Sequence, residues 1–581
     1  MMGILMTASS CGDMLDQDST HVIYAEDSHL DSEGDTLYSV IGIINTMQTI
    51  ADRTILLGEL RGDLVDVRSS TDADLREISN FAVSDDNEFN VPSDYYAVIN
   101  NCNYFIANAD TALKNNRNEY IFQKEYAAVK GFRAWTYLQL VLNYGKVPYV
   151  TDPILTKDES EADYPEMDIT TLCETLIDDI EDYATVETPD YGTIRNTDSE
   201  LFYFPIYVLL GDLNLWAGNY REAALCYYNY ISSRNGDDSA YPITTDNVEW
   251  GSDDTKWERP TDNWSDYMFN DEDVSSTGEL ITMIPGDSIP SEGNYSQLRN
   301  YFNSNSDNEY EVSIVASQGL LEISQAQTYC KLNSSYEVTY APSSMDDEEN
   351  IGDLRYQACY NQRSSYNVDG NSVDDYTQNS KYVTRNVHIY RRAHVYLRMA
   401  EALNRAGFPR FAFAILKTGV DNDVMEEDIL PYYPDDEAYL SQFDFNTSDY
   451  VIRTRAESSS ENTMGIHSRG SGWSEYNEYY EYPENEELSG TEAEEYEIEA
   501  VEDLIITEDA LETAFEGNRF YDLMRVALRR NDPSYLADKV YNRRGADNVA
   551  EMKSLIEKDL TVESNWYLNW NGEIGLGEEE E

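Results

Sequence analysis

Apolar residues recur with a helical period along much of the chain. Between residues 36 and 51, and again between 93 and 113, they are spaced three and four positions apart, which places them on one face of a helix. The same spacing predicts helices at about 121–144 and 169–184, whereas the polar residues 12–35 are predicted to be extended. The pattern therefore favours a mainly α fold.

The helix predicted at 121–144 has apolar residues on nearly every side, which indicates that other helices enclose it. These residues are Phe132, Trp135, Leu138, Val141, Leu142 and Tyr144. Gly145 can adopt the left-handed conformation that ends a helix, and Pro148 cannot rejoin the helical hydrogen-bond ladder. We expect the helix to end at this glycine.

Two segments match the order of residues in a tetratricopeptide-type helical hairpin. In the first, from Tyr207 to Tyr227, Gly211 would let two helices close and aromatic residues would fill the gap. The second, 396–416, repeats the order more loosely. Such hairpins must stack to bury their faces. Because the two starts are much farther apart than the period of about 34 residues typical of tandem repeats, we expect other helical pairs to lie between them.

Two stretches interrupt the helical pattern. Residues 235–380 are rich in Asn, Ser, Asp, Gly and Tyr and contain short β-like runs such as Glu311–Val315. Residues 421–500 hold dense acidic and aromatic segments such as Trp473–Tyr482. Long irregular insertions on a helical frame commonly carry binding residues. We therefore expect a binding site in these insertions.

The net charge of the chain limits which macromolecules it can bind. The chain has 581 residues, 40 Lys and Arg against 111 Asp and Glu, and a formal net charge of −71. This charge makes nucleic acids and anionic membrane surfaces poor partners, because both favour clustered basic residues. A hydrophobic content of 41% argues against a disordered acidic chain. No Pro/Gly/Ser-rich linker separates apolar halves, so one large body is predicted.

Motifs for catalysis and for common cofactors are absent. The sequence has no HExxH, GxSxG, GxxxxGK[ST] or CxxC motif, and its histidines lack metal-ligand spacing. The abundance of acidic residues makes carboxylate pairs uninformative as a signal for glycoside hydrolysis. We predict a protein that is not an enzyme and needs no cofactor. A loop that could hold calcium, or form an ordinary hydrated turn, contains Asp369, Asn371, Asp374 and Asp375.

Noncovalent binding of sugars has better support. A sugar ring presents an apolar C–H face and a rim of hydroxyls, so its site needs exposed aromatic rings beside polar side chains. Trp264, which follows Asn263, and Trp473 lie in polar loops with such neighbours. The alternative is that each tryptophan packs its insertion onto the helical frame. Trp135 and Trp216 lie in helical patterns and are predicted to be core residues.

Two structural ion pairs are also predicted. Arg519 and Asp522 are three residues apart on one helical face, a spacing at which opposite charges meet. We expect them to pair with each other, and we expect Arg133 to make a similar structural ion pair.

Five segments together resemble the SusD/RagB family of surface glycan-binding lipoproteins. The most specific is Lys130–Val150, in which an arginine and an aromatic helix precede Tyr-Gly-x-Val-Pro. The others, in the order of the family, are Cys11–Asp16, Leu57–Asp63, Asn379–Gly407 and Phe515–Arg525. Weaker similarities occur at Glu279–Ile284, Gly352–Arg355 and Gly465–Gly470.

The resemblance implies an architecture and a location. It implies a SusD-like frame of tetratricopeptide-type hairpins with long irregular and short-strand insertions, with an N-terminal region at 12–234 packed as one body with a C-terminal region at 235–581. Residues 1–11 resemble a truncated lipoprotein signal that ends at a lipidated Cys11. No later apolar run approaches the ~18 residues of a membrane span, so attachment to the outer membrane, facing the cell exterior, would be through lipid only.

The resemblance also implies a function and further ligand contacts. A member of this family would capture oligosaccharides and deliver them to a partner SusC-like TonB-dependent transporter. The loop before the second helix would contribute Asn87, Phe89, Asn90 and Tyr95. Two alternatives stay open at this point, namely peptide cargo, as on the RagB side of the family, and a surface glycoside hydrolase.

Overall fold

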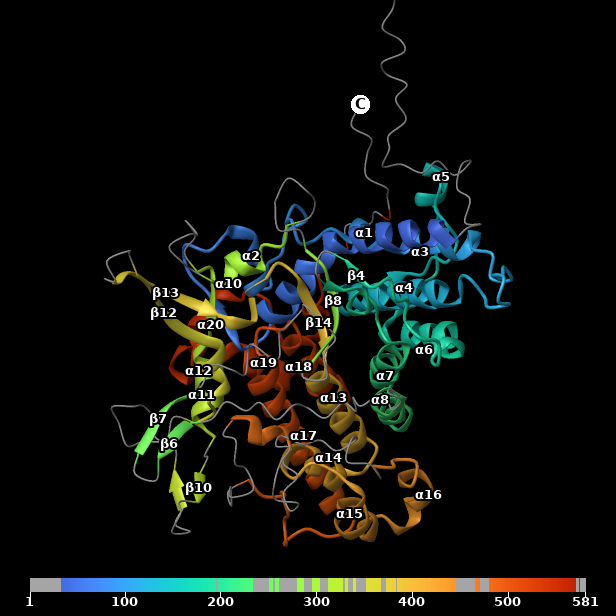
Figure 1. Cartoon of the computed structure of the whole chain (residues 1–581). Helices are drawn as coiled ribbons and strands as arrows, with labels where there is room; N and C mark the ends of the chain where they lie inside the picture. The colour runs from blue at the N-terminus through green and yellow to red at the C-terminus, as the bar shows by residue number, and fades with distance from the viewer. Residues whose placement is uncertain are drawn as a thin grey trace, which may run out of the picture.

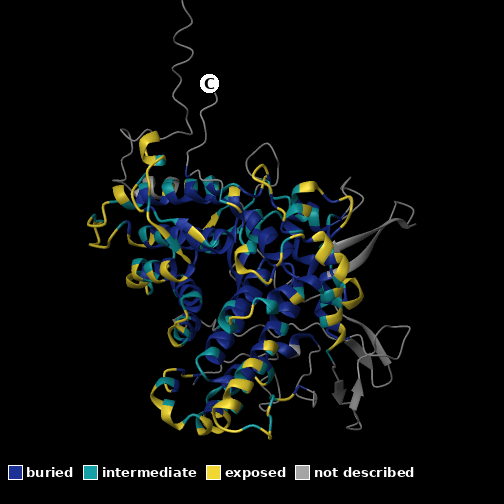
Figure 2. Cartoon of the chain, turned by 180° about the vertical axis from the view of Figure 1, so that it is seen from behind, coloured by how far each residue is buried: buried dark blue, intermediate teal, exposed yellow. Residues whose placement is uncertain are grey.

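A computed structural model describes most of the chain after residue 32. The described residues are 33–194, 197–233, 250–253, 256–260, 279–286, 295–303, 312–327, 330–332, 338–340, 352–366, 372–382, 384–445, 465–470, 480–570 and 574. The predicted mainly α fold is confirmed, because helices make up most of these ranges. Figure 2 shows buried residues concentrated in the central helices and exposed residues at the outer turns.

The predicted N-terminal helices are present with shifted ends. They are α1 (Glu33–Leu60), α3 (Pro92–Asn108), α4 (Gln123–Tyr144) and α6 (Ile169–Ile180), and they pack in the order α1, α3, α4, α6 (Figure 1). Helix α1 runs well past the predicted end at Ala51. Its last turns are buried on all sides, so a search for an apolar stripe missed them.

Helix α4 is enclosed as predicted. Trp135 is 0% exposed, and its ring stacks on that of Phe204 with centroids 4.9 Å apart. The helix ends at Gly145, which has a φ of 76°. Trp216 differs from its prediction, because its side chain is half-buried with the Arg525 guanidinium 5.2 Å from its ring.

Both predicted hairpins form, and they pack on each other. The first joins α7 (Ile206–Ala217) to α8 (Tyr220–Ser233), and the second joins α13 (Arg392–Arg405) to α14 (Pro409–Lys417). A Cβ on Gly211 would lie 2.3 Å from the Tyr227 ring, so only glycine lets these helices close. Helix α13 packs directly against α8, so the expectation of intervening helical pairs is wrong.

The other helices follow the chain around this frame. They are α2 (Ala73–Ser79), α5 (Lys157–Ser160), α10 (Leu298–Phe302), α11 (Gln318–Gln325), α12 (Arg355–Cys359), α15 (Asn422–Val424), α16 (Glu437–Leu440), α17 (Thr491–Thr513), α18 (Arg519–Arg530), α19 (Ser534–Tyr541) and α20 (Val549–Leu555). The stretch predicted as irregular up to residue 500 therefore includes the start of α17. Its first turns are acidic without an apolar stripe, and they continue a helix whose second half is buried.

The strands form short antiparallel pairs. These are β1 (Val65–Val67) with β9 (Ile314–Ala316), β2 (Lys146–Pro148) with β3 (Glu166–Asp168), β4 (Thr193–Ile194) with β5 (Thr197–Asp198), β6 (Trp250–Asp253) with β7 (Lys256–Pro260), β8 (Leu280–Ile284) with β14 (Val387–Arg391), β10 (Cys330–Leu332) with β11 (Val338–Tyr340), and β12 (Tyr360–Tyr366) with β13 (Ser372–Asn379). The β-like run predicted at Glu311–Val315 lies partly in β9. The β1–β9 pair, with Val65 opposite Ala316, joins the end of α1 to the first insertion.

The core is shared across the predicted boundary at 234/235. It includes residues of α1, α4 and α7 together with residues of α13, α17 and α18. The boundary itself falls next to residues outside the described ranges, so the division into two regions stays a prediction. No helix within the described ranges combines the length and apolar composition needed to cross a membrane.

A cluster of buried ion pairs joins several segments of this fold. Glu512 of α17 contacts three guanidinium groups, those of Arg391 at 2.7 Å, Arg355 at 2.8 Å and Arg469 at 2.8 Å. All four side chains are at most 1% exposed. Burial by itself would raise the pKa of Glu512, but the three arginines outweigh it and hold the pKa well below its usual range.

Further carboxylates extend the cluster to other segments. Glu279, just before β8, lies 3.0 Å from Arg391 and 2.7 Å from Arg469. Glu508 lies 2.6 Å from Arg355, and Glu516 lies 2.7 Å from Arg391. The cluster, here called the Glu512 cluster, therefore joins α12, α17, β8, β14 and the turn Ile466–Gly470.

Of the two predicted ion pairs, one is confirmed and one is wrong. Arg133 pairs with Asp179 at 2.7 Å. Arg519 does not pair with Asp522; its Nε and Nη2 groups donate to Asp63 at 2.6 Å and 3.0 Å. Asp522 instead accepts from Arg525 at 2.5 Å. Arg519 thus binds Asp63, which is far away in sequence, and not Asp522 on its own helix.

We expect Arg469→Met to destabilise the fold strongly. The change removes one cation between Glu279 and Glu512, and breaking a buried ion pair typically costs about 3–5 kcal/mol. Urea unfolding followed by circular dichroism measures the loss. The matched control is Lys157→Met, which removes an exposed pair with Glu161 and is expected to change stability by less than about 1 kcal/mol. Equal effects of both changes would contradict a central role for the cluster.

A second buried carboxyl group makes stability depend on pH. Glu59 of α1 accepts a hydrogen bond from the Gly517 N–H at 2.8 Å, where a Cβ on Gly58 would lie 1.7 Å from the Gly517 carbonyl oxygen. Burial raises the pKa of Glu59 from 4.5 to about 7. The folded state therefore binds this proton more tightly than the unfolded state does. The resulting stabilisation is complete below pH 4.5 and is lost as the pH rises to about 7.

Glu59→Gln should therefore raise the melting temperature at pH 8 and have less effect at pH 5. The amide keeps the acceptor for Gly517 but cannot ionise, so we expect a gain of at least ~1 °C at pH 8. Thermal melts of both proteins across this pH range provide the measurement. A gain that is larger at pH 5 than at pH 8 would show that folding lowers the pKa of Glu59 instead of raising it.

Candidate functional site

A cavity of about 220 Å³, here called the α1 cavity, lies where α1 meets the loop before α3 and the end of the β8–β14 pair. Its lining residues are Gln48, Thr49, Ala51, Asp52, Arg53, Glu88, Phe89, Ile284, Pro285, Gly286, Tyr295, Ser296, Gln297, Tyr301, Arg385 and Val387. They come from separate parts of the chain, so tertiary packing creates the cavity.

Helix α1 supplies one wall of the cavity and binds a second wall, which is made by residues 285–286 and 295–297. Gln48, Asp52 and their neighbours lie about one turn apart and so face the same side. Asp52 accepts hydrogen bonds from the Ser296 hydroxyl at 2.6 Å and from the Gln297 N–H at 2.7 Å. The Gln48 amide donates to the Pro285 carbonyl at 2.6 Å. Burial raises the pKa of Asp52 although these hydrogen bonds oppose the shift.

Arg53, the next residue of α1, holds a third wall, which is the loop before α3. Arg53 pairs with Asp94 of α3 at 2.5 Å and donates to the Val91 carbonyl at 3.2 Å. It thereby fixes the loop that carries Glu88 and Phe89 against α1. The cavity walls are thus held by part-buried polar contacts to one long helix.

Aromatic rings and one arginine complete the lining. Phe89, Tyr295 and Tyr301 contribute rings, and the Arg385 guanidinium lies 3.9 Å from the centre of the Tyr295 ring. Arg385 also donates to the Ser296 carbonyl at 2.8 Å and to the Asn300 side-chain oxygen at 3.1 Å. Burial, and then the charge of Glu88, raise the pKa of Tyr301, so its hydroxyl stays protonated.

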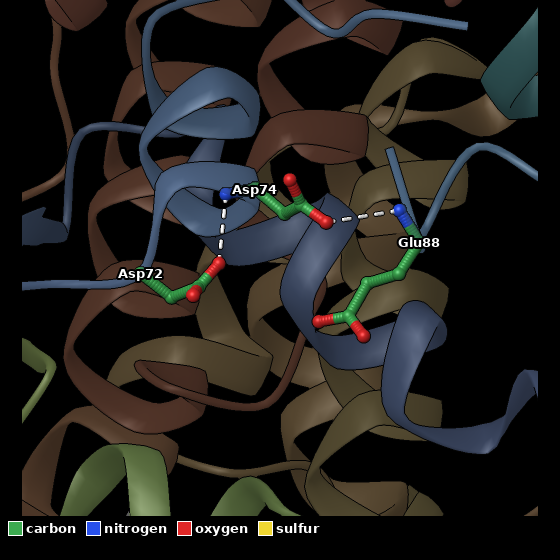
Figure 3. Close-up of side chains that lie close together, drawn as sticks. All are labelled: Asp72, Asp74 and Glu88. Carbon is green, nitrogen blue, oxygen red and sulfur yellow. Dashed lines mark hydrogen bonds between the residues drawn. The ribbon is translucent and has the colours of Figure 1, made fainter. Parts of the chain in front are cut away.

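Three carboxylates gather beside the cavity, as Figure 3 shows. Asp72, Asp74 and Glu88 each offer an oxygen within 4.8 Å of the others. The backbone uses two of them, since Asp72 accepts from the Asp74 N–H at 2.8 Å and Asp74 from the Glu88 N–H at 3.1 Å (Figure 3). Burial, followed by the charges of Asp74 and Asp72, raises the pKa of Glu88. In the structure these carboxylates cap the start of α2 and hold the loop that carries Glu88.

The four residues implied by the family resemblance lie in the loop before α3 and, for Tyr95, in α3 itself, and one of them belongs to the lining of this cavity. Phe89 lines it. Asn87, Asn90 and Tyr95 are each 1% exposed, and the amides support the loop from within. The Asn87 amide donates to the Asp74 carbonyl at 3.1 Å, and Asn90 accepts from the Tyr144 hydroxyl at 2.9 Å. Their contact with a ligand stays a prediction.

The remaining candidates lie beyond the described part of the chain. The residues outside it are the predicted sugar contacts Asn263, Trp264 and Trp473 and the predicted lipidation site Cys11. Two residues of the proposed calcium loop, Asp369 and Asn371, are outside it as well. Asp374 and Asp375 belong to β13, opposite Ser365 and Ser364 of β12, with their side chains not described. The roles of these residues stay predictions.

Sequence reasoning missed most of the cavity lining. Asp52 and Arg53 did give a signal, because they are adjacent charged residues inside the apolar helix α1. Tyr295, Tyr301 and Arg385 gave none, since many tyrosines occur in the insertions and nothing in the sequence joins them to α1. The lining combines aromatic rings, amides, carboxylates and a guanidinium, which suits noncovalent recognition of a polyhydroxylated ligand.

Comparison with known proteins gives a consistent result. A family model described as "SusD family" matches residues 228–568. The curated SusD-like protein P2 of Formosa agariphila is 28% identical over 232 residues, which cover 38% of this chain and 43% of that protein. The matched part thus spans less than half of that relative's length.

Solved structures share the fold. A SusD superfamily protein from Bacteroides vulgatus superposes with a TM-score of 0.55 at 14% identity, over 93% of this chain and 96% of the other. A putative sugar binding protein from the same organism gives 0.53 at 16% identity, over 85% and 86%. A SusD superfamily protein from Bacteroides thetaiotaomicron gives 0.52 at 16% identity, over 91% and 98%.

Removing the Asp52 carboxylate should loosen the wall made by residues 295–297. In Asp52→Ala, the Gln297 N–H and the Ser296 hydroxyl lose their acceptor, so we expect amide hydrogen exchange across 295–301 to speed up by about tenfold or more. Mass spectrometry of the exchanged protein measures it. Asp179→Ala, which removes a carboxylate that binds Arg133 and Lys130, is the control and should leave this segment unchanged. Unaltered exchange in Asp52→Ala would show that other contacts hold the wall.

Proposed function

Since this chain belongs to the SusD family, we propose that it is a glycan-binding protein that captures oligosaccharides noncovalently at the α1 cavity. The observation that supports the proposal is the lining of the cavity. Rings of Phe89, Tyr295 and Tyr301 lie beside the polar groups of Gln48, Asp52 and Arg385. A sugar needs this combination, because its C–H face stacks on aromatic rings while its hydroxyls need donors and acceptors.

The size of the cavity suits one sugar unit. Pockets that enclose a drug-sized ligand usually measure about 300–1,000 Å³, and this cavity is smaller at about 220 Å³. One ring of a longer chain would therefore enter while the rest stays outside. Aromatic contacts and a few hydrogen bonds, reduced by ordering costs, correspond to dissociation constants on the order of 10 μM to 1 mM. Binding of this strength permits release to a next protein.

Family membership supports the wider proposal. The protein would be attached by lipid at Cys11 to the outer membrane, facing the cell exterior, and would pass its oligosaccharide to a SusC-like TonB-dependent transporter. It would act as a binding protein rather than an enzyme. In this role the protein makes no covalent change to its cargo, and the rigid helical frame keeps the cavity formed before the ligand arrives.

We expect Tyr301→Ala to weaken binding of oligosaccharides by about tenfold, because an aromatic contact contributes roughly 0.5–1.5 kcal/mol beyond the area it buries. Calorimetric titration with a panel of oligosaccharides measures the change. Tyr120→Ala is the matched control, since Tyr120 is 50% exposed and lies outside the cavity lining.

The panel also separates the alternatives. No binding to any saccharide by folded protein, with binding to a tryptic peptide mixture, would replace sugar by peptide as the cargo. Release of shortened products during the titration would indicate a glycosidase. Equal losses in Tyr301→Ala and Tyr120→Ala would place the binding site elsewhere.

A further inference from the structure

Arg385 of the cavity lining makes no ion pair with a carboxylate of the described residues, whereas many other arginines of this chain do. Acidic residues outnumber basic ones by 111 to 40, and arginines such as Arg133, Arg519 and Arg525 are bound by carboxylates. In the cavity itself, Arg53 is bound by Asp94. Within the described ranges, Arg385 makes no ion pair.

The contacts of Arg385 orient its guanidinium without neutralising it. Its two acceptors, the Ser296 carbonyl and the Asn300 side-chain oxygen, are uncharged. The Tyr295 ring, 3.9 Å away, supports the flat face of the group. A guanidinium carries several N–H donors in one plane, so donors remain for a ligand. Burial lowers the pKa of Arg385, and an arginine stays protonated at neutral pH all the same.

Charge is distributed unevenly around the cavity. The charged groups that act on Arg385 are Arg299 and Asp52, and the Asp52 carboxylate is already bound by Ser296 and Gln297. At Glu88 the charges of Asp74 and Asp72 raise the pKa beyond the effect of burial, and the opposing effect of Arg53, itself bound by Asp94, is smaller. The cavity thus has a cationic part at Arg385 and an anionic part at Glu88.

We propose that Arg385 binds an anionic group on the ligand, so that the cavity selects an acidic sugar unit over a neutral one. This inference rests on the proposed function. The oxyanion would be a uronate carboxylate or a sulfate ester, both of which match the planar donors of a guanidinium. The carboxylates near Glu88 would repel that group, so the acidic substituent would point toward Arg385. The strongly negative net charge does not prevent this, because salt screens charges beyond roughly 8 Å.

Matched oligosaccharides test the proposal by calorimetry. We compare a uronate-containing oligosaccharide, the same compound with its carboxylate reduced to an alcohol, and a sulfated neutral oligosaccharide with its desulfated form. The native protein should bind at least one acidic member about tenfold more tightly than its uncharged counterpart. If the preference occurs in the uronate pair, the anionic group is a carboxylate, and if it occurs in the sulfated pair, the group is a sulfate.

Two variants assign the preference to Arg385. Arg385→Gln keeps a donor for the Ser296 carbonyl but removes the charge, so the acidic and uncharged ligands should bind equally, at the level of the uncharged ligand. Arg385→Lys keeps the charge without the planar pair of donors and should retain a reduced, more salt-sensitive preference. Melting temperatures show whether each variant is folded. Arg410→Gln is the control, a half-buried arginine that lies outside the cavity lining and does not act on Arg385, and it should leave the preference intact.

The outcomes separate this inference from the proposed function. Binding of neutral glycans with no preference for acidic ones overturns the role of Arg385 and leaves the proposed function standing. A preference that survives in folded Arg385→Gln, or that disappears in Arg410→Gln instead, overturns the assignment to Arg385. Absence of binding to every saccharide by folded protein overturns the proposed function itself.

Discussion

The Glu512 cluster is the interaction on which the rest of the structure depends. It gathers arginines from α12, from the end of β14 and from the turn Ile466–Gly470 around carboxylates of α17 and Glu279. Charges this deeply buried are tolerated only when each meets its partner in good geometry. The cluster therefore permits few alternative arrangements of these segments. Because β8 and β14 both leave it, their pairing is fixed at one end by Glu279 and Arg391.

The other end of that strand pair opens on the cavity. Ile284 ends β8, Val387 begins β14, and both line it. Helix α1 crosses this end and binds the neighbouring segments through Gln48, Asp52 and Arg53. A rigid centre thus holds strands whose far ends carry irregular segments. This arrangement suits recognition, because the walls are ordered before a ligand binds and little entropy is lost on binding.

Electrostatics acts at two scales in this protein. The net charge of −71 limits the partners that the surface attracts. Inside the fold, individual pairings decide instead, as the pKa values of Glu512 and Glu59 illustrate by shifting in opposite directions. Glu512 is surrounded by arginines, whereas desolvation dominates at Glu59. The character of a site such as the α1 cavity therefore follows from its own few charges and not from the composition of the chain.

The sequence by itself determined the helical frame, the end of α4 at Gly145 and the existence of both hairpins, because periodicity and glycine conformation act over a few residues. It also indicated the loop containing Phe89 through family resemblance. Only the tertiary structure decided that the hairpins pack on each other, that Arg519 binds Asp63, and that Tyr295, Tyr301 and Arg385 meet Asp52. Such contacts join residues hundreds of positions apart, and no local pattern specifies which of many equivalent arginines, tyrosines and carboxylates will meet.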